Sequence, residues 1–170
     1  MVQKDFRTLD ILLVGTKKGF LPKMIRKFTK SKYNHVAIVI EYCGMLYVAE
    51  AVKKGFLPTY KLEDWIIRQK AKGNSVCVKR KPGFMTIKEK DKYYQRVRHI
   101  TGARYDYANL LLFQLIKSIF QFYVGNKNRK RVICSEAVAY IYLEVFPEWW
   151  KVSPDEIYEH EYFKEVLKYK

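Results

Sequence analysis

Two β-rich runs separated by a short turn constrain the fold of this chain most strongly. Residues 35–40 and 45–52 are rich in β-branched and aromatic side chains, and Cys43-Gly44 lies between them, which is the pattern of a β-hairpin. With a four-residue loop, antiparallel pairing places His35 directly opposite Glu50. With a two-residue loop at Cys43-Gly44 the two are diagonal neighbours on one face, whereas a three-residue loop separates them. Two of these three turns therefore predict a histidine–carboxylate pair.

The other patterns predict further strands and a set of helices concentrated toward the C-terminus. Thr86 and Glu89 have the spacing of a capping box, and Ser153-Pro154 combines a cap with proline at the first helical position. The sequence contains no repeat, low-complexity segment or linker, so residues 1–170 are interpreted as one domain. This order predicts an α+β fold with an antiparallel sheet packed against helices. We expect strands at 10–14 and 75–79, and helices at 21–30, 62–69, 86–100, 107–124 and 134–145.

A large excess of basic residues bears on the partners of the chain. Its 33 Lys and Arg against 17 Asp and Glu give a net charge of +16, which attracts anionic partners at long range. The basic residues are spread along the chain without a nucleic-acid-reading motif, so we predict no specific nucleic-acid partner. An anionic membrane surface stays a candidate partner, and scattered solvated charge is the alternative. The sequence makes no prediction of oligomeric state.

The chain shows no pattern of export or of a membrane span. Its first ten residues are polar, and the apolar run at 11–14 is too short for the core of a signal peptide. The apolar stretch at 110–124 falls short of the ~20 residues that cross a bilayer. Three cysteines without CxxC spacing indicate free thiols rather than zinc ligands. We therefore expect a cytoplasmic protein without metal or cofactor, and a peripheral place at a membrane stays open.

Cys134 is the candidate nucleophile because it follows a basic polar loop and opens an apolar helix. A thiol at a helix N-terminus faces unsatisfied N–H groups and the positive end of the helix dipole, and both favour the thiolate. The alternative is a small apolar core residue. In the same way, His35 could be a half-buried histidine and Glu50 an edge carboxylate. Cys77 fits a core position better than Cys134 does, and Cys43 fits an exposed turn.

The chain resembles the circularly permuted branch of the NlpC-type papain-like cysteine peptidases, the YiiX/YaeF-like proteins. In that branch the histidine strand precedes the cysteine helix, and the order His35, Glu50, Cys134 matches. The resemblance spans nearly the whole chain and implies a permuted papain-like fold. It is carried by four short motifs, SKYNHVAIVI at 31–40, VAEA at 48–51, GARYDY at 102–107 and ICSEAV at 133–138.

Roles for individual residues follow from this resemblance. It implies that Cys134 is the nucleophile, that His35 is the general base and that Glu50 orients the histidine. Tyr105 corresponds to the tyrosine that lines the site and helps to bind the oxyanion; from the residue alone it is equally well a core tyrosine. The implied mechanism is attack of the thiolate on a carbonyl carbon, followed by hydrolysis of a thioester acyl-enzyme.

Three functions are compatible with these observations. The first is a cysteine hydrolase acting on a peptide-like amide, with a cell-wall peptide as one candidate. The second is a lipid-directed thioesterase, amidase or acyltransferase on the same site, which the apolar stretch 110–124 and the positive charge favour. The third is a basic module that binds nucleic acid or membrane without catalysis. The substrate is expected to be a small molecule of peptide-like or acyl character.

Overall fold

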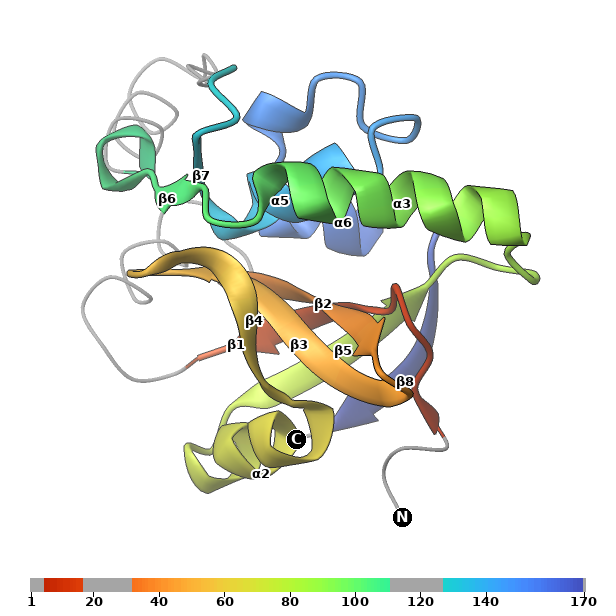
Figure 1. Cartoon of the computed structure of the whole chain (residues 1–170). Helices are drawn as coiled ribbons and strands as arrows, with labels where there is room; N and C mark the ends of the chain where they lie inside the picture. Colours follow the sequence, from red (N-terminus) through yellow and green to blue (C-terminus); the bar gives the residue numbers. More distant parts are fainter. Residues whose placement is uncertain (1–4, 17–31, 111–126, 170) are drawn as a thin grey trace.

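A six-stranded antiparallel sheet forms the centre of the protein (Figure 1). The computed structural model describes residues 5–16, 32–110 and 127–169. The strand order is β4-β3-β2-β1-β5-β8, and a short parallel pair, β6-β7, lies apart from this sheet. The strands are β1 (Ile11–Gly15), β2 (His35–Tyr42), β3 (Met45–Val52), β4 (Gly55–Lys61), β5 (Ser75–Arg80), β6 (Arg104–Tyr105), β7 (Arg131–Val132) and β8 (Lys164–Tyr169).

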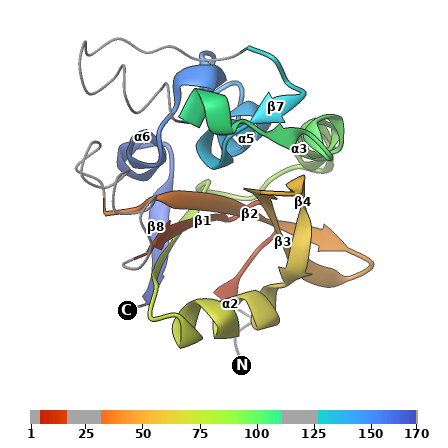
Figure 2. The same ribbon diagram turned by 90° about the vertical axis from the view of Figure 1, so that its left-hand side faces the viewer.

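Helices cover both faces of the sheet. Helices α3 (Ile87–Ile100), α5 (Cys134–Ile141) and α6 (Pro154–Glu159) lie on one side, and α2 (Leu62–Ala71) lies on the other (Figures 1 and 2). A short 3-10 helix, η2 (Trp149–Lys151), precedes α6. Because both faces of the central strands are covered, these strands are continuously apolar rather than alternating.

The alternation along β2 divides its side chains between two cores. Val36 and Ile38 pack in the cluster that contains α5, whereas Ala37 and Val39 pack in the cluster that contains α2. Along β3, Val48 belongs to the α2 cluster and Ala49 to the α5 cluster. Glu50 is two residues beyond Val48 and so lies on the face toward α2.

The turn between β2 and β3 settles the register that the sequence left open. Cys43 and Gly44 both have positive φ, 49° and 72°, as a two-residue type I′ turn requires. The strands therefore continue to Tyr42 and Met45, and Ala37 rather than His35 lies opposite Glu50. Direct pairing through a four-residue loop is thus wrong, and the diagonal arrangement through the Cys43-Gly44 turn is confirmed.

The capping patterns predicted the helix starts well. Thr86 Oγ1 accepts the Glu89 N–H while the Glu89 carboxylate accepts the Thr86 N–H, so the predicted capping box of α3 is confirmed. Ser153 caps α6 in the same way, with Pro154 at its first position. The predicted strands at 10–14 and 75–79 correspond to β1 and β5, and the predicted helix at 62–69 corresponds to α2.

Other elements differ from expectation or lie outside the described part. Helix α5 ends at Ile141 rather than at 145, in a run of turns before Pro147, which cannot continue a helix. Strands β4 and β8 and the β6-β7 pair were not predicted. The predicted helix at 21–30, and residues 111–124 of the predicted helix at 107–124, lie outside the described residues. No helix in the described ranges has the length and apolar character of a membrane span.

Candidate active site

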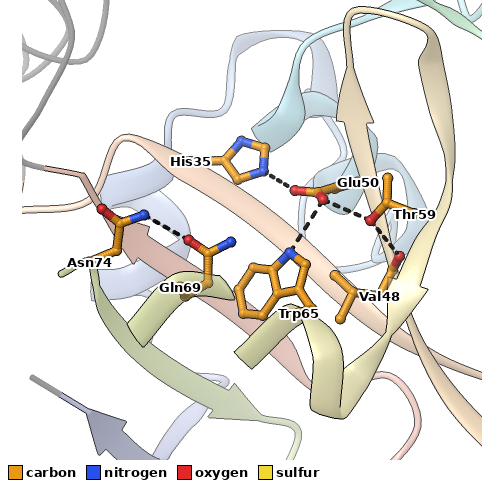
Figure 3. A network of polar contacts seen from close by, with 7 residues as sticks. All are labelled: His35, Val48, Glu50, Thr59, Trp65, Gln69 and Asn74. Carbon is orange, nitrogen blue, oxygen red and sulfur yellow. Dashed lines mark hydrogen bonds and ion pairs between the residues drawn. The ribbon is translucent and has the colours of Figure 1, made fainter. Parts of the chain in front are cut away.

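His35 and Glu50 form a close pair at the start of β2. The His35 Nε2 atom lies 2.6 Å from Glu50 Oε2 (Figure 3). Diagonal neighbours on one sheet face are within reach when their side chains are long enough, and histidine and glutamate both are. The pair predicted from the hairpin is therefore present, although its register differs from the directly opposed one.

The second oxygen of Glu50 is held by two further donors that the sequence analysis did not identify. Glu50 Oε1 accepts hydrogen bonds from Thr59 Oγ1 at 2.7 Å and from Trp65 Nε1 at 3.2 Å (Figure 3). Thr59 lies on β4, which was not predicted, and Trp65 lies in α2, where its apolar spacing marks it only as a core residue. Both therefore lacked a sequence signal for the site.

These contacts keep Glu50 ionised inside the protein. Its side chain is only 9% exposed, and burial alone would raise its pKa. The hydrogen bond and charge of His35, together with the hydrogen bonds from Thr59 and Trp65, outweigh burial and lower the pKa of Glu50. A carboxylate fixed at both oxygens holds the imidazole ring in one orientation and leaves Nδ1 as its free nitrogen.

Cys134 occupies the first position of α5 and lies beside His35. Burial alone would lower the pKa of His35, but hydrogen bonding to Cys134 and Glu50, together with the charges of both, raises it to about 10. Both Cys134 and Glu50 therefore lie close enough to the imidazole to act on its pKa. Glu50 reaches it from the α2 face of the sheet, whereas Cys134 belongs to the cluster on the α5 face. His35 is the first residue of β2, at the end of the strand.

The N-terminus of α5 departs from ordinary capping. The N-cap residue is Ile133, whose side chain makes no capping hydrogen bond, although Ser, Thr, Asp and Asn are the usual residues there. The Ile133 N–H is instead accepted by Glu136 Oε2 at 3.0 Å. Amides at the start of α5 are thus left uncapped next to the thiol, where they can bind an oxyanion.

Glu136 ties this helix start to the segment after β6. Its other oxygen, Oε1, accepts the Asn109 side-chain N–H at 2.7 Å, and the Asn109 backbone N–H is bonded to Asp106 Oδ1 at 3.0 Å. Burial raises the pKa of Glu136 to about 8, against the lowering effect of its hydrogen bonds from Ile133 and Asn109. Neither Glu136 nor Asn109 was proposed as a site residue from the sequence.

Tyr105 lies next to the thiol at the end of β6. Burial raises the pKa of its hydroxyl, and the nearby Cys134, Tyr107 and Glu136 raise it further. The ring packs against Leu110 and Ile133 and contacts the Tyr107 ring at a centroid distance of 4.7 Å. The structure therefore brings together all four residues predicted for the site, His35, Glu50, Cys134 and Tyr105.

The remaining histidines and cysteines lie elsewhere. His99 is bonded to the Tyr140 hydroxyl, and His160 stacks edge-on against Phe146. Cys77 is buried and Cys43 is exposed, as expected for a core position and a turn.

Comparisons with known proteins agree with this arrangement. The model of a protein family described as "permuted papain-like amidase enzyme, YaeF/YiiX, C92 family" matches residues 10–153 of this chain. The crystal structure of the metalloprotein YiiX from Escherichia coli O157:H7 has a TM-score of 0.60 and 20% identity, covering 96% of this chain and 97% of that one. No sequence among the curated proteins matches this chain.

In the described ranges, no group of three or more His, Cys, Asp or Glu side chains could hold a metal ion. The YiiX likeness extends over nearly the whole chain and shows the shared fold. The family match covers most of the sequence, and we conclude that the chain belongs to the permuted papain-like amidase family of YaeF and YiiX and is a hydrolase-type enzyme.

Proposed function

We propose that this enzyme hydrolyses a peptide-like amide bond through Cys134, His35 and Glu50. The observation that carries the proposal is the His35 ring, which Glu50 fixes at 2.6 Å and whose pKa the nearby Cys134 raises. His35 keeps 26% of its side chain exposed, so it is open to a substrate. Glu50 is shielded, as suits a residue that orients the imidazole.

The proposed reaction has two steps. The Cys134 thiolate forms a bond to the carbonyl carbon, and the amine leaves with a proton from the His35 imidazolium. Water then attacks the thioester and gives its proton to His35, which releases the acid and restores the thiolate. The uncapped amides at the start of α5 and the Tyr105 hydroxyl would stabilise the oxyanion of each step. A cell-wall peptide fragment is one candidate substrate.

The experiment is trapping of the acyl-enzyme. An activated acyl amide is mixed with the protein, and the mass of the intact chain is followed within one turnover. We expect a mass increase on Cys134 in the wild type and in Cys43→Ala, which removes the exposed thiol. We expect none in Cys134→Ala, and slow acylation in His35→Gln. Acylation that persists in Cys134→Ala would refute the proposed nucleophile.

Two further aspects of the expected function depend on other observations. The lipid-directed alternative depended on the positive charge and on the apolar stretch 110–124, and most of that stretch lies outside the described residues. All three cysteines are free, and we propose a reducing, cytoplasmic environment on that ground.

A further inference from the structure

A basic groove lies beside the β6-β7 pair. Its volume is about 630 Å³, and it lies between the C-terminal end of α3 and the β6-β7 pair. Four of its lining side chains are cationic, and none is acidic. They are Arg104, Arg129, Lys130 and Arg131, which line it together with His99 and Asn128.

The pairing of β6 with β7 concentrates this charge. Arg104 lies opposite Arg131, and Tyr105 lies opposite Val132. Successive strand residues point to opposite faces, so the two arginines share the outer face, while Tyr105 and the fully buried Val132 share the inner one. Like charges that lie on one face of two paired strands repel each other. The chain therefore places two arginines where they repel each other.

In the part of the chain that the structure describes, no ion pair offsets this repulsion. All 17 Asp and Glu residues lie in the described ranges, and within those ranges no ion pair joins any of them to the four cations. Arg129 instead lies over the Tyr140 ring at 5.2 Å, and the Tyr140 hydroxyl is bonded to His99 Nδ1 at 2.9 Å. Contacts with the Tyr140 ring, rather than an ion pair with a carboxylate, therefore fix this wall of the groove.

Stabilisation of the α3 C-terminus does not account for four cations. A cation there complements the helix dipole, but two of the last four carbonyls already have partners. Val97 O accepts the Thr101 N–H, and Ile100 O accepts the Ala103 N–H. The remaining positive charge is therefore available to bind an anionic ligand.

We propose that this groove binds a phosphate monoester group, at a place distinct from the acylation site. A phosphate monoester carries about two negative charges and three acceptor oxygens, and arginine forks match phosphate oxygens in pairs. Arg104 and Arg131 immediately precede Tyr105 and Val132 on β6 and β7. A group bound by both arginines would therefore stabilise the two strands that carry Tyr105 and lead into α5. The proposal does not depend on the proposed amide hydrolysis.

Titration with inorganic phosphate at constant ionic strength, followed by NMR of the histidine rings, tests the site. His99 lines the groove, whereas His35 and His160 do not and serve as internal controls. We expect a saturable shift of the His99 signals alone. In the double variant Arg104→Gln/Arg131→Gln the phosphate affinity should fall by about tenfold or more, because charge-assisted hydrogen bonds are lost.

A matched control separates the groove from net charge. Lys61→Gln/Lys72→Gln removes two exposed cations at the ends of α2, beyond the opposite face of the sheet, and should change phosphate affinity by less than about twofold. Equal losses in both double variants, or no His99 shift, would overturn the proposal. Sedimentation with phosphatidylcholine vesicles that contain phosphatidic acid identifies the source of the group. Binding that requires Arg104 and Arg131 assigns it to a lipid headgroup, and a His99 response to free phosphate alone assigns it to a small phosphorylated molecule.

Discussion

Replacing Glu136 with glutamine should lower the stability of the protein at acidic pH and raise it at alkaline pH. Glu136 is 1% exposed, and its pKa is raised from 4.5 to about 8. A group whose pKa is raised by folding contributes stability below its unfolded pKa and loses that contribution as pH rises through its folded pKa. The wild type should therefore lose stability between pH 4.5 and about pH 8 on account of this residue. Glutamine has no charge to bury.

The size of the effect follows from the two pKa values. Each pH unit between them is worth about 1.4 kcal/mol, so the free energy of unfolding attributable to Glu136 falls by at most ~5 kcal/mol. At pH 5 the carboxyl group is protonated but both of its oxygens can still accept, whereas the amide nitrogen of glutamine cannot, so the variant should be less stable by about 1 kcal/mol. At pH 9 it should be more stable than the wild type by a few kcal/mol.

Urea unfolding followed by tryptophan fluorescence, from pH 5 to pH 9 under reducing conditions, measures this difference. Titrations shared by both proteins cancel when the free energies are subtracted at each pH. Glu161→Gln, at an exposed position, serves as the control and should differ from the wild type by the same small amount at every pH. A difference between Glu136→Gln and wild type that stays constant, or that grows more unfavourable with pH, would refute the reasoning.

Three other substitutions test separate parts of the structure. Trp65→Phe removes the indole donor to Glu50 and should raise the pKa of Glu50, so that the acid limb of the kcat/KM profile moves to higher pH. Tyr105→Phe should slow acylation by about tenfold or more in single-turnover kinetics with Tm nearly unchanged; a normal rate would remove Tyr105 from the oxyanion site. Arg80→Gln leaves the buried Asp10 without its two 2.7 Å hydrogen bonds from the guanidinium, and should lower the free energy of unfolding by about 3 kcal/mol in urea. Lys88→Gln, at an exposed position on α3, serves as the control and should change it very little.

The sequence predicted what depends on neighbouring residues. The hairpin, the capping boxes and the position of Cys134 at a helix start each arise within a few residues, and each is present. The two-residue turn requires a positive φ at Cys43, and a non-glycine residue with positive φ is uncommon. The residue type therefore gave no reason to choose the two-residue turn over the four-residue turn. Even so, the His35–Glu50 pair was robust, because both turns leave the two side chains on one face.

What could not be predicted depends on pairings between distant segments. Arg104 and Arg131 lie opposite each other in the parallel β6-β7 pair. Each of these strands has only two residues, too few to show a periodic pattern in the sequence. The donors to Glu50 come from β4 and α2, and nothing in the residues around Thr59 or Trp65 indicates that their side chains turn toward a histidine. Only Tyr105 was anticipated in this region, and that prediction came from the resemblance rather than from its neighbours.

The N-cap of α5 shows how a local defect marks the site. Isoleucine is among the poorest N-cap residues, and Ile133 leaves amides at the helix start without a side-chain partner. In an ordinary helix this costs stability without benefit. Here Glu136 satisfies the Ile133 amide from within the helix, so the chain compensates one donor and leaves the neighbouring amides without a side-chain cap beside the thiol. An N-cap that breaks the local rule, followed by cysteine and by an acid three residues on, therefore places amide donors beside the thiol of the candidate nucleophile, and local rules are typically broken at functional sites.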